Sequence, residues 1–307
     1  MIMNVSSRLV TVDEFSIGQR LDNYLLKKLK GVPRPHIYRI IRKGEVRVNK
    51  GRKKAEYKLQ LNDVVRIPPI KLAAEKSIKY STNFIDLLSK SVLYEDEGLM
   101  IINKQNGVAV HSGSGVNVGV IEALKDKYNQ PIELVHRLDR ATSGCLILAK
   151  KRSVLKDLHQ QLVKHQMDKR YIAFVKNSWS KKYHTIDAPI FQNSRYSVVD
   201  IKGKESISIF HPIKNFQDKD YSASLVEVEI KTGRTHQIRV HAKYADHPIA
   251  QDDKYGDHLF DKAMKKKGLD RLFLHAKSVT FTNPTTNEIQ KVVAPLPVEL
   301  EDFLNKL

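Results

Sequence analysis

The sequence predicts an α+β protein in which a small basic module precedes a larger domain built on a mixed, largely antiparallel sheet. Two observations carry this prediction. Residues 1–70 hold 16 of the 53 Lys and Arg residues but only 6 of the 34 Asp and Glu residues, so more than half of the net charge of +19 lies there. Beyond residue 90, apolar runs with strand periodicity follow one another with few helical patterns between them, unlike a doubly wound fold.

The charge balance indicates the kind of partner. A formal charge of +19 and an isoelectric point near 9.7 favour a polyanion, either nucleic acid or an anionic membrane surface. Hydrophobic content of 41% and charged content of 28% are typical of a globular protein, and no apolar run is long enough to span a bilayer. The single cysteine, Cys145, rules out an internal disulfide. Because the N-terminus shows no signal-peptide pattern, we expect a cytoplasmic protein without a membrane partner.

The basic module is predicted to contain two helices and a short sheet. An amphipathic helix is expected over 19–29, and a second helix follows that Gly44 ends in a left-handed conformation. The apolar residues of these helices recur with helical spacing: Leu21, Leu25, Leu29, Ile37, Ile40 and Ile41. Strands are expected over 46–49 and 64–67, with a basic turn between them. We place this module at residues 13–68.

A linker is predicted over residues 69–90. Its start is marked by the pair Pro68 and Pro69, and it continues with mixed Lys, Ala, Ser and Thr residues without sustained periodicity. The larger domain then extends over 91–307. Its expected strands cover 92–94, 99–102, 169–175, 206–210 and 222–231, with a further strand pair around the Asn283–Pro284 turn. Its expected helices are 118–128, one that Ser153 caps, 236–244 capped by Thr235, and one at the C-terminal end.

The stretch over 133–151 is the most informative part of the larger domain. Two apolar runs indicate buried strands, and the polar segment between them holds Arg137, Asp139 and Arg140. Opposite charges close by favour the ionised form of a carboxyl group, which a nucleophile or a base requires. From these residues alone, Asp139 is equally well explained as a reactive carboxylate or as a structural ion pair at a strand end.

Four histidines raise the question of a metal site. They are His236, His241, His247 and His275. The first two are five residues apart, which fits neither one helix face nor a zinc-finger pattern, and no cysteine accompanies them. Asp252 and Asp253 are adjacent carboxylates, which we assign to a loop. We therefore expect no metal ion.

The basic module resembles the S4 domain, which is named after a ribosomal protein. The resemblance rests on R-L-D-N-Y-L-L-K-K followed by I-Y-R-I-I-R-K-G-E-V-R-V-N-K. It implies binding to structured RNA through backbone phosphates and shape. The basic residues expected to contact RNA are Arg34, Arg39, Arg42, Lys43, Arg47, Lys50, Arg52 and Lys53.

The larger domain resembles the RluA family of pseudouridine synthases, among them enzymes that act on large-subunit rRNA. Residues 136–144, H-R-L-D-R-A-T-S-G, match the signature of that family, and residues 233–241, G-R-T-H-Q-I-R-V-H, match its arginine motif. Residues 169–171 and 272–276 match its tyrosine and C-terminal motifs. One departure is Gln251, where many family members have glycine.

The resemblance implies a role for each matched residue. Asp139 is expected to be the catalytic aspartate and Arg239 its ion-pair partner. Tyr171 is expected to stack on the target base, and Leu274 to form an apolar wall above it. Arg137 would enter the RNA helix in place of the extruded uridine, and Arg140 would also contact the substrate.

The implied reaction breaks a C–N glycosidic bond, rotates the uracil and rejoins it through carbon, so no cofactor is required. The expected partner is large-subunit rRNA, either free or in an assembling particle, and we expect the chain to act as a monomer. Two alternatives stay open: an RNA-binding or ribosome-assembly factor without activity, and an enzyme with a tRNA or another rRNA site as substrate.

Overall fold

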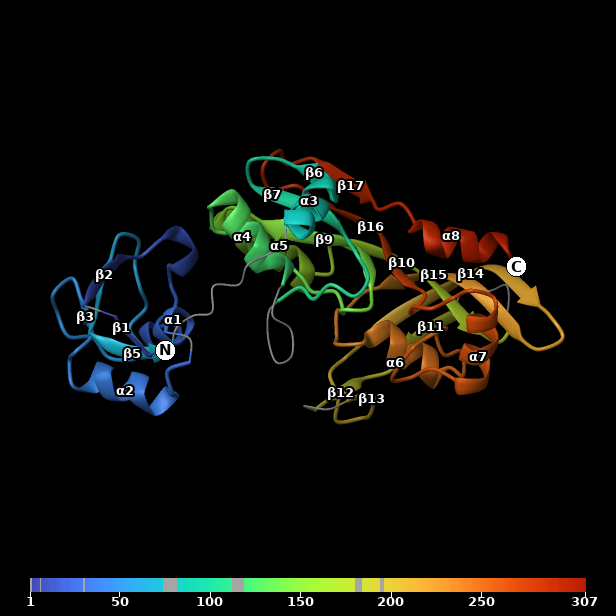
Figure 1. Cartoon of the computed structure of the whole chain (residues 1–307), viewed down its shortest axis with the longest axis horizontal. Helices are drawn as coiled ribbons and strands as arrows, with labels where there is room; N and C mark the ends of the chain where they lie inside the picture. The colour runs from blue at the N-terminus through green and yellow to red at the C-terminus, as the bar shows by residue number, and fades with distance from the viewer. Residues whose placement is uncertain are drawn as a thin grey trace. The chain divides into compact units, whose positions relative to one another are not determined.

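A computed structural model describes residues 2–5, 7–29, 31–73, 82–111, 119–179, 184–193 and 196–307. The chain forms two compact units, Met1–Lys79 and Tyr80–Leu307 (Figure 1). Among the helices of these described ranges, none is long and apolar enough to cross a bilayer.

The N-terminal unit packs two α-helices and one short 3₁₀ helix with a small sheet. Its helices are η1 (Glu14–Ser16), α1 (Leu21–Lys28) and α2 (Arg34–Arg42). Its three-stranded sheet has the order β2-β4-β3, with bounds Arg8–Thr11, Val64–Ile67 and Arg47–Val48. The predicted inward residues Leu21, Leu25, Leu29, Ile37, Ile40 and Ile41 are all buried in one apolar cluster. Gly44 has a φ of 70°, so the left-handed end of α2 is confirmed.

Two parts of the range predicted as a linker have regular structure. Ile70–Ala73 form β5, which pairs antiparallel with β1 (Ile2–Val5). Thr82–Lys90 form α3. Residues 74–81 lie outside the described residues. Four residues are too few to show sustained strand periodicity, so β5 was not predicted.

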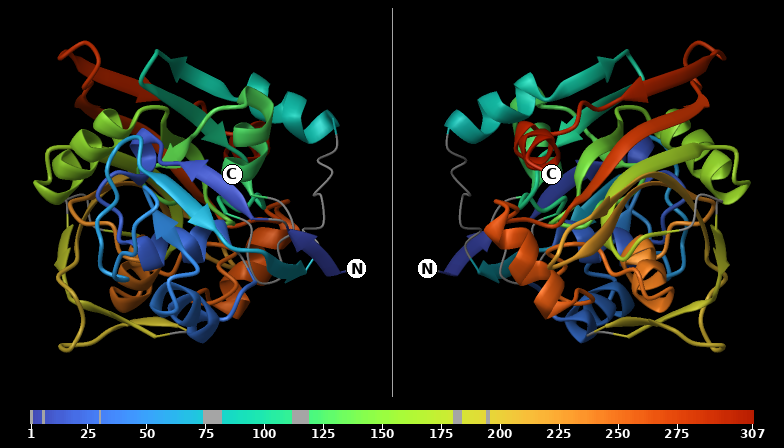
Figure 2. Two further views of the ribbon diagram at one scale, coloured as in Figure 1. Left: turned by 90° about the vertical axis from the view of Figure 1, so that its left-hand side faces the viewer. Right: turned by 90° about the vertical axis from the view of Figure 1, so that its right-hand side faces the viewer.

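The larger unit is organised by one ten-stranded sheet. Its path is β11-β14-β15-β10-β16-β9-β7-β6, with β17 paired to β16 and β8 paired to β9. Every pairing is antiparallel except that of β9 with β16, so the predicted mixed, largely antiparallel sheet is confirmed. The strands are β6 (Val92–Glu95), β7 (Leu99–Lys104), β8 (Glu133–Leu134), β9 (Ser143–Ala149), β10 (Asp168–Lys176), β11 (His184–Asp187), β14 (Ile207–Gln217), β15 (Ser222–Ile230), β16 (Leu274–Thr282) and β17 (Ile289–Val293). In both views of Figure 2, the β16–β17 hairpin lies beside β6 and β7.

Helices cover both faces of this sheet. One apolar cluster joins α4 (Val120–Tyr128) and α6 (Gln237–Tyr244) to the sheet. A second apolar cluster joins α5 (Arg152–Val163) to the sheet. A third joins α7 (His258–Lys266) and α8 (Val298–Asn305) to it. The two-residue period of β10 sends Tyr171 toward the α4 and α6 cluster and Phe174 toward α7 and α8. A small hairpin, β12 (Ile190–Gln192) and β13 (Ser197–Val199), lies beside α6 (Figure 1).

Two predicted helix caps are wrong. Lys151 and His236, rather than Ser153 and Thr235, occupy the N-cap positions of α5 and α6. Ser153 already lies inside α5, whose apolar face is aligned for packing on β9. The turn before α6 is fixed instead by the side chain of Gln237, whose Oε1 accepts hydrogen bonds from the Arg234 amide and the Thr232 hydroxyl. The sequence H-S-G-S-G at 111–115 is expected to form a flexible loop, and residues 112–115 of it lie outside the described residues.

Candidate active site

Asp139 lies in the turn that connects β8 to β9. The Thr142 amide donates to the Asp139 carbonyl over 3.1 Å and closes the turn. Two residues later, Gly144 has a φ of 110°, and a Cβ added there would lie 2.2 Å from the Ala276 carbonyl oxygen. Because only glycine allows this close approach, β9 can pair with β16 at its first residues. This crossing brings Asp139 close to Leu274 at the start of β16.

Hydrogen bonds from the side chain of Lys104 also hold this turn in place. The Lys104 ammonium group is completely buried and donates to the carbonyls of Gln105, Val108 and Arg140 over 2.9, 3.0 and 3.2 Å. Burial lowers the pKa of Lys104 to about 7. Arg140 and Gly107 also exchange two hydrogen bonds, from the Gly107 amide to the Arg140 carbonyl and from Arg140 Nε to the Gly107 carbonyl.

The arginine nearest the Asp139 carboxylate comes from α6. Nη1 of Arg239 lies 3.5 Å from Asp139 Oδ2. The local sequence suggested that Arg137 and Arg140 flank the carboxylate, but Arg140 is held by Gly107. The pairing with Arg239 that the family resemblance implies is present, although the two residues are far apart in the sequence.

Asp252, which the sequence analysis assigned to a loop, holds this arginine in place. Nε and Nη2 of Arg239 donate to the two Asp252 oxygens over 2.8 and 2.6 Å, and Nη2 also reaches Asp253 over 2.7 Å. Burial alone would lower the pKa of Arg239, but the bond to Asp252 and the charges of Asp139 and Asp253 raise it above its usual value. The cation is therefore permanent, and Nη1 is left for Asp139.

The departure at Gln251 has a backbone explanation. Gln251 has a φ of 59°, in the left-handed region that glycine adopts most readily. Its side chain donates to the Asp261 carbonyl over 2.6 Å, and its amide donates to the Asp261 carboxylate, which keeps the turn before Asp252 in place. The segment from Gln251 to Asp252 therefore helps to hold Arg239 in place. The spacing of its residues in the sequence did not reveal this role.

His236 and Tyr255 complete the surroundings of Asp139. His236 Nε2 lies 3.9 Å from Asp139 Oδ2, the oxygen that Arg239 also approaches. The Tyr255 hydroxyl forms a 2.9 Å hydrogen bond with His236 Nδ1, and the Tyr255 ring lies under the Arg239 guanidinium at 5.2 Å. From the sequence, His236 was part of the matched arginine motif and was assessed for a role only as a metal ligand, and the segment that contains Tyr255 was given no role.

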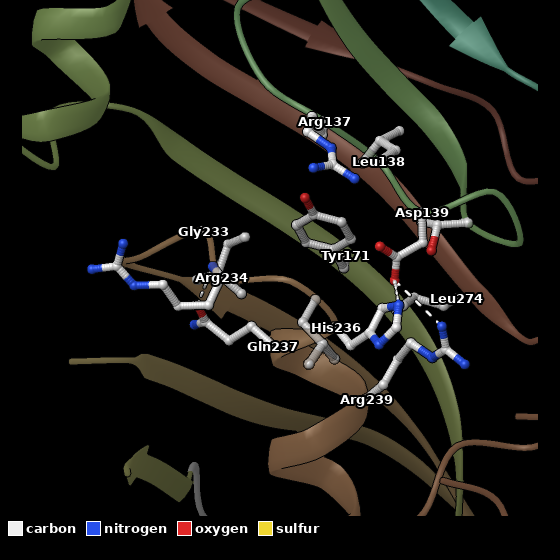
Figure 3. Close-up of a pocket in the computed structure, with 13 residues that line it drawn as sticks. Arg137, Leu138, Asp139, Tyr171, Gly233, Arg234, His236, Gln237, Arg239 and Leu274 are labelled. Atoms are coloured by element: carbon white, nitrogen blue, oxygen red, sulfur yellow. Dashed lines mark hydrogen bonds and ion pairs between the residues drawn. The ribbon is translucent and has the colours of Figure 1, made fainter. Parts of the chain in front are cut away.

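A small pocket opens beside Asp139. Tyr171 and Leu274 form part of its wall, and Arg239 and His236 lie at the side of Asp139 (Figure 3). One oxygen of Asp139 faces Arg239 and His236, whereas the other is turned toward the Tyr171 ring (Figure 3). Burial and the charge of Asp139 raise the pKa of Tyr171, so its phenol stays neutral.

Arg137 lies at the mouth of this pocket and is exposed to solvent. In the part of the chain that the structure describes, its guanidinium has no hydrogen-bond or ion-pair partner. A wider depression next to the pocket shares Arg137 and Asp139 and also contains Arg140 and Lys254. Free positive charge at the pocket mouth is suited to nucleic acid.

The remaining histidines make structural hydrogen bonds. His241 lies between the Ser208 hydroxyl and the Ala188 carbonyl, and His275 between the Ser143 hydroxyl and the Ala294 carbonyl. His247 contacts the Lys176 carbonyl. Among the described residues, no group of three or more His, Cys, Asp or Glu side chains is arranged to hold a metal ion.

The basic residues expected to bind RNA lie on the surface of the N-terminal unit. Seven of them are exposed, and Arg47 is half-buried because its guanidinium donates to the Gly44 carbonyl. They are Arg34, Arg39, Arg42 and Lys43 around α2, and Lys50, Arg52 and Lys53 after β3. Within the described ranges, no carboxylate lies within ion-pair distance of any of the eight.

Sequence comparison agrees with this geometry. Residues 98–244 match the family described as RNA pseudouridylate synthase, and residues 19–65 match the S4 domain. A ribosomal large subunit pseudouridine synthase C from Pasteurella multocida is 48% identical over 100% of this chain and 95% of that protein. The chain belongs to the RNA pseudouridylate synthase family. An Escherichia coli pseudouridine synthase of the same name is 45% identical over 98% of this chain and 97% of its own.

Solved pseudouridylate synthases share the fold. Human RNA pseudouridylate synthase domain containing 4 has a TM-score of 0.60 at 24% identity, over 73% of this chain and 95% of that chain. Human RNA pseudouridylate synthase domain containing 1 has a TM-score of 0.56 at 24% identity, over 67% and 83% of the two chains. The resemblance found in the sequence motifs is thus confirmed, and this pseudouridine synthase is an enzyme with an N-terminal S4 domain.

Proposed function

We propose that this pseudouridine synthase converts uridines of large-subunit ribosomal RNA to pseudouridine, with Asp139 as its catalytic residue. The observation that carries the proposal is the Asp139 carboxylate. One of its oxygens is approached by Arg239, and the other is turned toward the Tyr171 ring in a pocket that Leu274 also lines. The substrate class is supported by relatives named ribosomal large subunit pseudouridine synthase C.

The reaction is an isomerisation whose atoms balance within the nucleotide. The bond between ribose C1′ and uracil N1 breaks, the base rotates, and a bond forms between C1′ and C5. C5 then loses its proton, and N1 gains one. Asp139 acts on the ribose or the base as a nucleophile, or on the sugar as a base, and each of these roles requires an ionised carboxylate. Arg239 places a positive charge 3.5 Å from this carboxylate.

The other pocket residues would hold the uracil during its rotation. Tyr171 offers an aromatic face on which an unstacked base can stack. Leu274 restricts the base on the side of β16 and excludes water. Arg137 would occupy the space that the flipped uridine leaves in the RNA helix, which offsets part of the cost of a few kcal/mol for unstacking. Arg140, whose Nε is bonded to Gly107, retains its other guanidinium nitrogens for RNA phosphate.

The S4 domain is proposed to anchor the rRNA through phosphate contacts of its exposed basic residues. We propose that the enzyme acts as a monomer in the cytoplasm. Free rRNA and an assembling subunit are the two forms in which the substrate would be presented.

The test uses large-subunit rRNA labelled with tritium at uracil C5, because C5 loses its hydrogen only when the new bond forms. Purified enzyme should release tritium from naked rRNA or from precursor particles, and the faster of the two identifies the substrate form. Tritium release from tRNA but from neither rRNA form would contradict the proposed substrate.

A further inference from the structure

Tyr255 and His236 form a chain of hydrogen bonds that ends beside Asp139. The Ser197 amide at the start of β13 donates to the Tyr255 hydroxyl over 3.2 Å. The same hydroxyl contacts His236 Nδ1 over 2.9 Å, and His236 Nε2 faces Asp139 Oδ2 at 3.9 Å. The chain thus links the β12–β13 hairpin to the proposed catalytic carboxylate.

The donors in this chain determine which ring nitrogen of His236 carries the proton. A backbone amide can only donate, so the Tyr255 oxygen accepts from Ser197. Among the described residues, the only other partner of this hydroxyl is His236 Nδ1, and the phenol proton is satisfied by these partners only if it is donated there. A neutral imidazole whose Nδ1 accepts must carry its own proton on Nε2. The Nε2–H is therefore turned toward Asp139.

The surroundings keep the ring neutral. Burial lowers the pKa of His236, and the positive charges of Arg239 and Lys254 act in the same direction. Asp139 and Asp252 oppose this shift without reversing it. The neutral imidazole accordingly matches the proton arrangement that the hydrogen bonds require.

The backbone also holds the ring in this orientation. His236 has a φ of 57°, which is uncommon for a residue other than glycine and persists only where neighbouring contacts impose it. Gln237 supplies those contacts, since its Nε2 donates to the Ile207 carbonyl while its Oε1 accepts from Arg234 and Thr232. A strained residue next to a reactive carboxylate is typical of a functional site.

We propose that His236 is a positioning residue for Asp139 and that Tyr255 sets the tautomer that His236 needs for this task. Nε2–H of His236 and Nη1 of Arg239 approach the same oxygen, Oδ2, and together they leave Oδ1 facing the uracil pocket. This inference rests on the proposed catalytic role of Asp139. It adds two residues that the motif comparison did not connect with the reaction.

Amide substitutions at His236 test the proton arrangement. The amide nitrogen of glutamine in His236→Gln replaces Nε2–H, whereas that of asparagine in His236→Asn reaches only the position of Nδ1. We expect His236→Ala and His236→Asn to lower the single-turnover rate constant by on the order of 10- to 100-fold, as a misplaced reacting group does. His236→Gln should retain most of the rate. The dissociation constant for rRNA should change little in all three.

Tyr255→Phe tests the second residue, because it keeps the ring under Arg239 and removes only the hydroxyl. We expect a rate loss smaller than that of His236→Ala, and no additional loss when Tyr255→Phe is combined with His236→Gln, since an amide nitrogen has no tautomer to set. Tyr244→Phe, in the exposed part of α6, and His258→Gln, at the exposed start of α7, are the matched controls. Thermal unfolding midpoints identify variants that fail to fold, in which case Tyr255→Phe alone decides.

Two results would overturn the positioning role. One is a His236→Gln enzyme as slow as His236→Ala at the same unfolding midpoint. The other is a Tyr255→Phe enzyme with the rate constant of the wild type. Failure of the proposed function has a different signature, namely full activity in Asp139→Asn.

Discussion

The contribution of Asp252 to holding Arg239 can be measured by comparing substitutions of Asp252 and of its neighbour Asp253. Asp252 is buried beside Arg239, whereas the adjacent Asp253 contacts the same guanidinium with a side chain that is 77% exposed. Removing one partner of a buried ion pair costs about 3–5 kcal/mol, while an exposed pair contributes about 1 kcal/mol or less. Asp252→Asn should therefore destabilise the protein and lower its activity strongly, and Asp253→Asn should do neither. Denaturant unfolding and tritium release measure both effects; equal effects of the two variants would contradict the anchoring role.

Lys104 gives a prediction about pH. Its pKa falls from 10.5 in the unfolded chain to about 7 in the folded protein because the charged form is buried. Between these values the unfolded chain binds more protons, so the contribution of Lys104 to the free energy of unfolding rises with pH over this interval. Lys104→Met lacks this contribution, and its free energy of unfolding should rise less between pH ~7 and ~10 than that of the wild type. Parallel pH profiles in urea denaturation would contradict the assignment.

The sequence predicted which motif residues lie in the pocket, but it did not predict the contacts that hold them. Motif positions located Asp139, Tyr171, Arg239 and Leu274, and the structure gathers all four in one pocket. The roles of Asp252, His236 and Tyr255 were not predicted, because they depend on which atoms meet after the chain folds. The partner of Arg140 was not predicted either. Arg140 is next to Asp139 in the sequence, but its side chain donates a hydrogen bond to the Gly107 carbonyl.

The element that the site depends on most is the crossing of β9 and β16. Their parallel pairing at Ser143 and Gly144 interrupts an otherwise antiparallel sheet and brings two distant motifs together. Apolar periodicity predicted both strands but could not predict this pairing, because it arises from close backbone contact rather than from a side-chain pattern. The wrong caps at Ser153 and Thr235 have a similar cause, since packing and the Gln237 side chain fixed those helix starts.

Gly144→Ala tests the crossing. The variant would place a Cβ 2.2 Å from the Ala276 carbonyl in a left-handed conformation, so the strands must separate. The substitution should destabilise the larger unit by more than about 1 kcal/mol and reduce activity, because Asp139 and Leu274 would move apart. Circular dichroism melting and single-turnover kinetics provide the measurements. Wild-type stability in Gly144→Ala would show that the close approach is not required.

At the scale of the whole molecule, the uneven distribution of charge suggests a division of labour. The N-terminal unit, with its exposed basic residues, is proposed to hold RNA, and the larger unit carries the pocket. The sequence predicted this organisation from charge counts and motif order. It missed the strand β5, which is only four residues long, and the helix α3, which lies within the range predicted as a linker.

Removal of residues 1–79 tests the proposed anchor. The truncated enzyme should remain folded but bind rRNA more weakly, with a shallower dependence of affinity on salt, because each lost phosphate contact removes about 0.7–0.9 from the logarithmic salt slope. A full-length variant with Arg34, Arg39, Arg42 and Lys43 changed to Gln should show a smaller shift in the same direction. Filter binding over a salt series measures both. Identical salt slopes in the three proteins would exclude the N-terminal unit as the anchor.

The most direct test of the account is the Asp139→Asn variant, compared with Asp126→Asn at an exposed position of α4. Asparagine preserves the shape of the side chain but cannot act as a nucleophile or a base. We predict that Asp139→Asn binds rRNA with wild-type affinity and releases no tritium from uracil C5, while Asp126→Asn behaves as the wild type. Tritium release at the wild-type rate by Asp139→Asn would contradict the central claim.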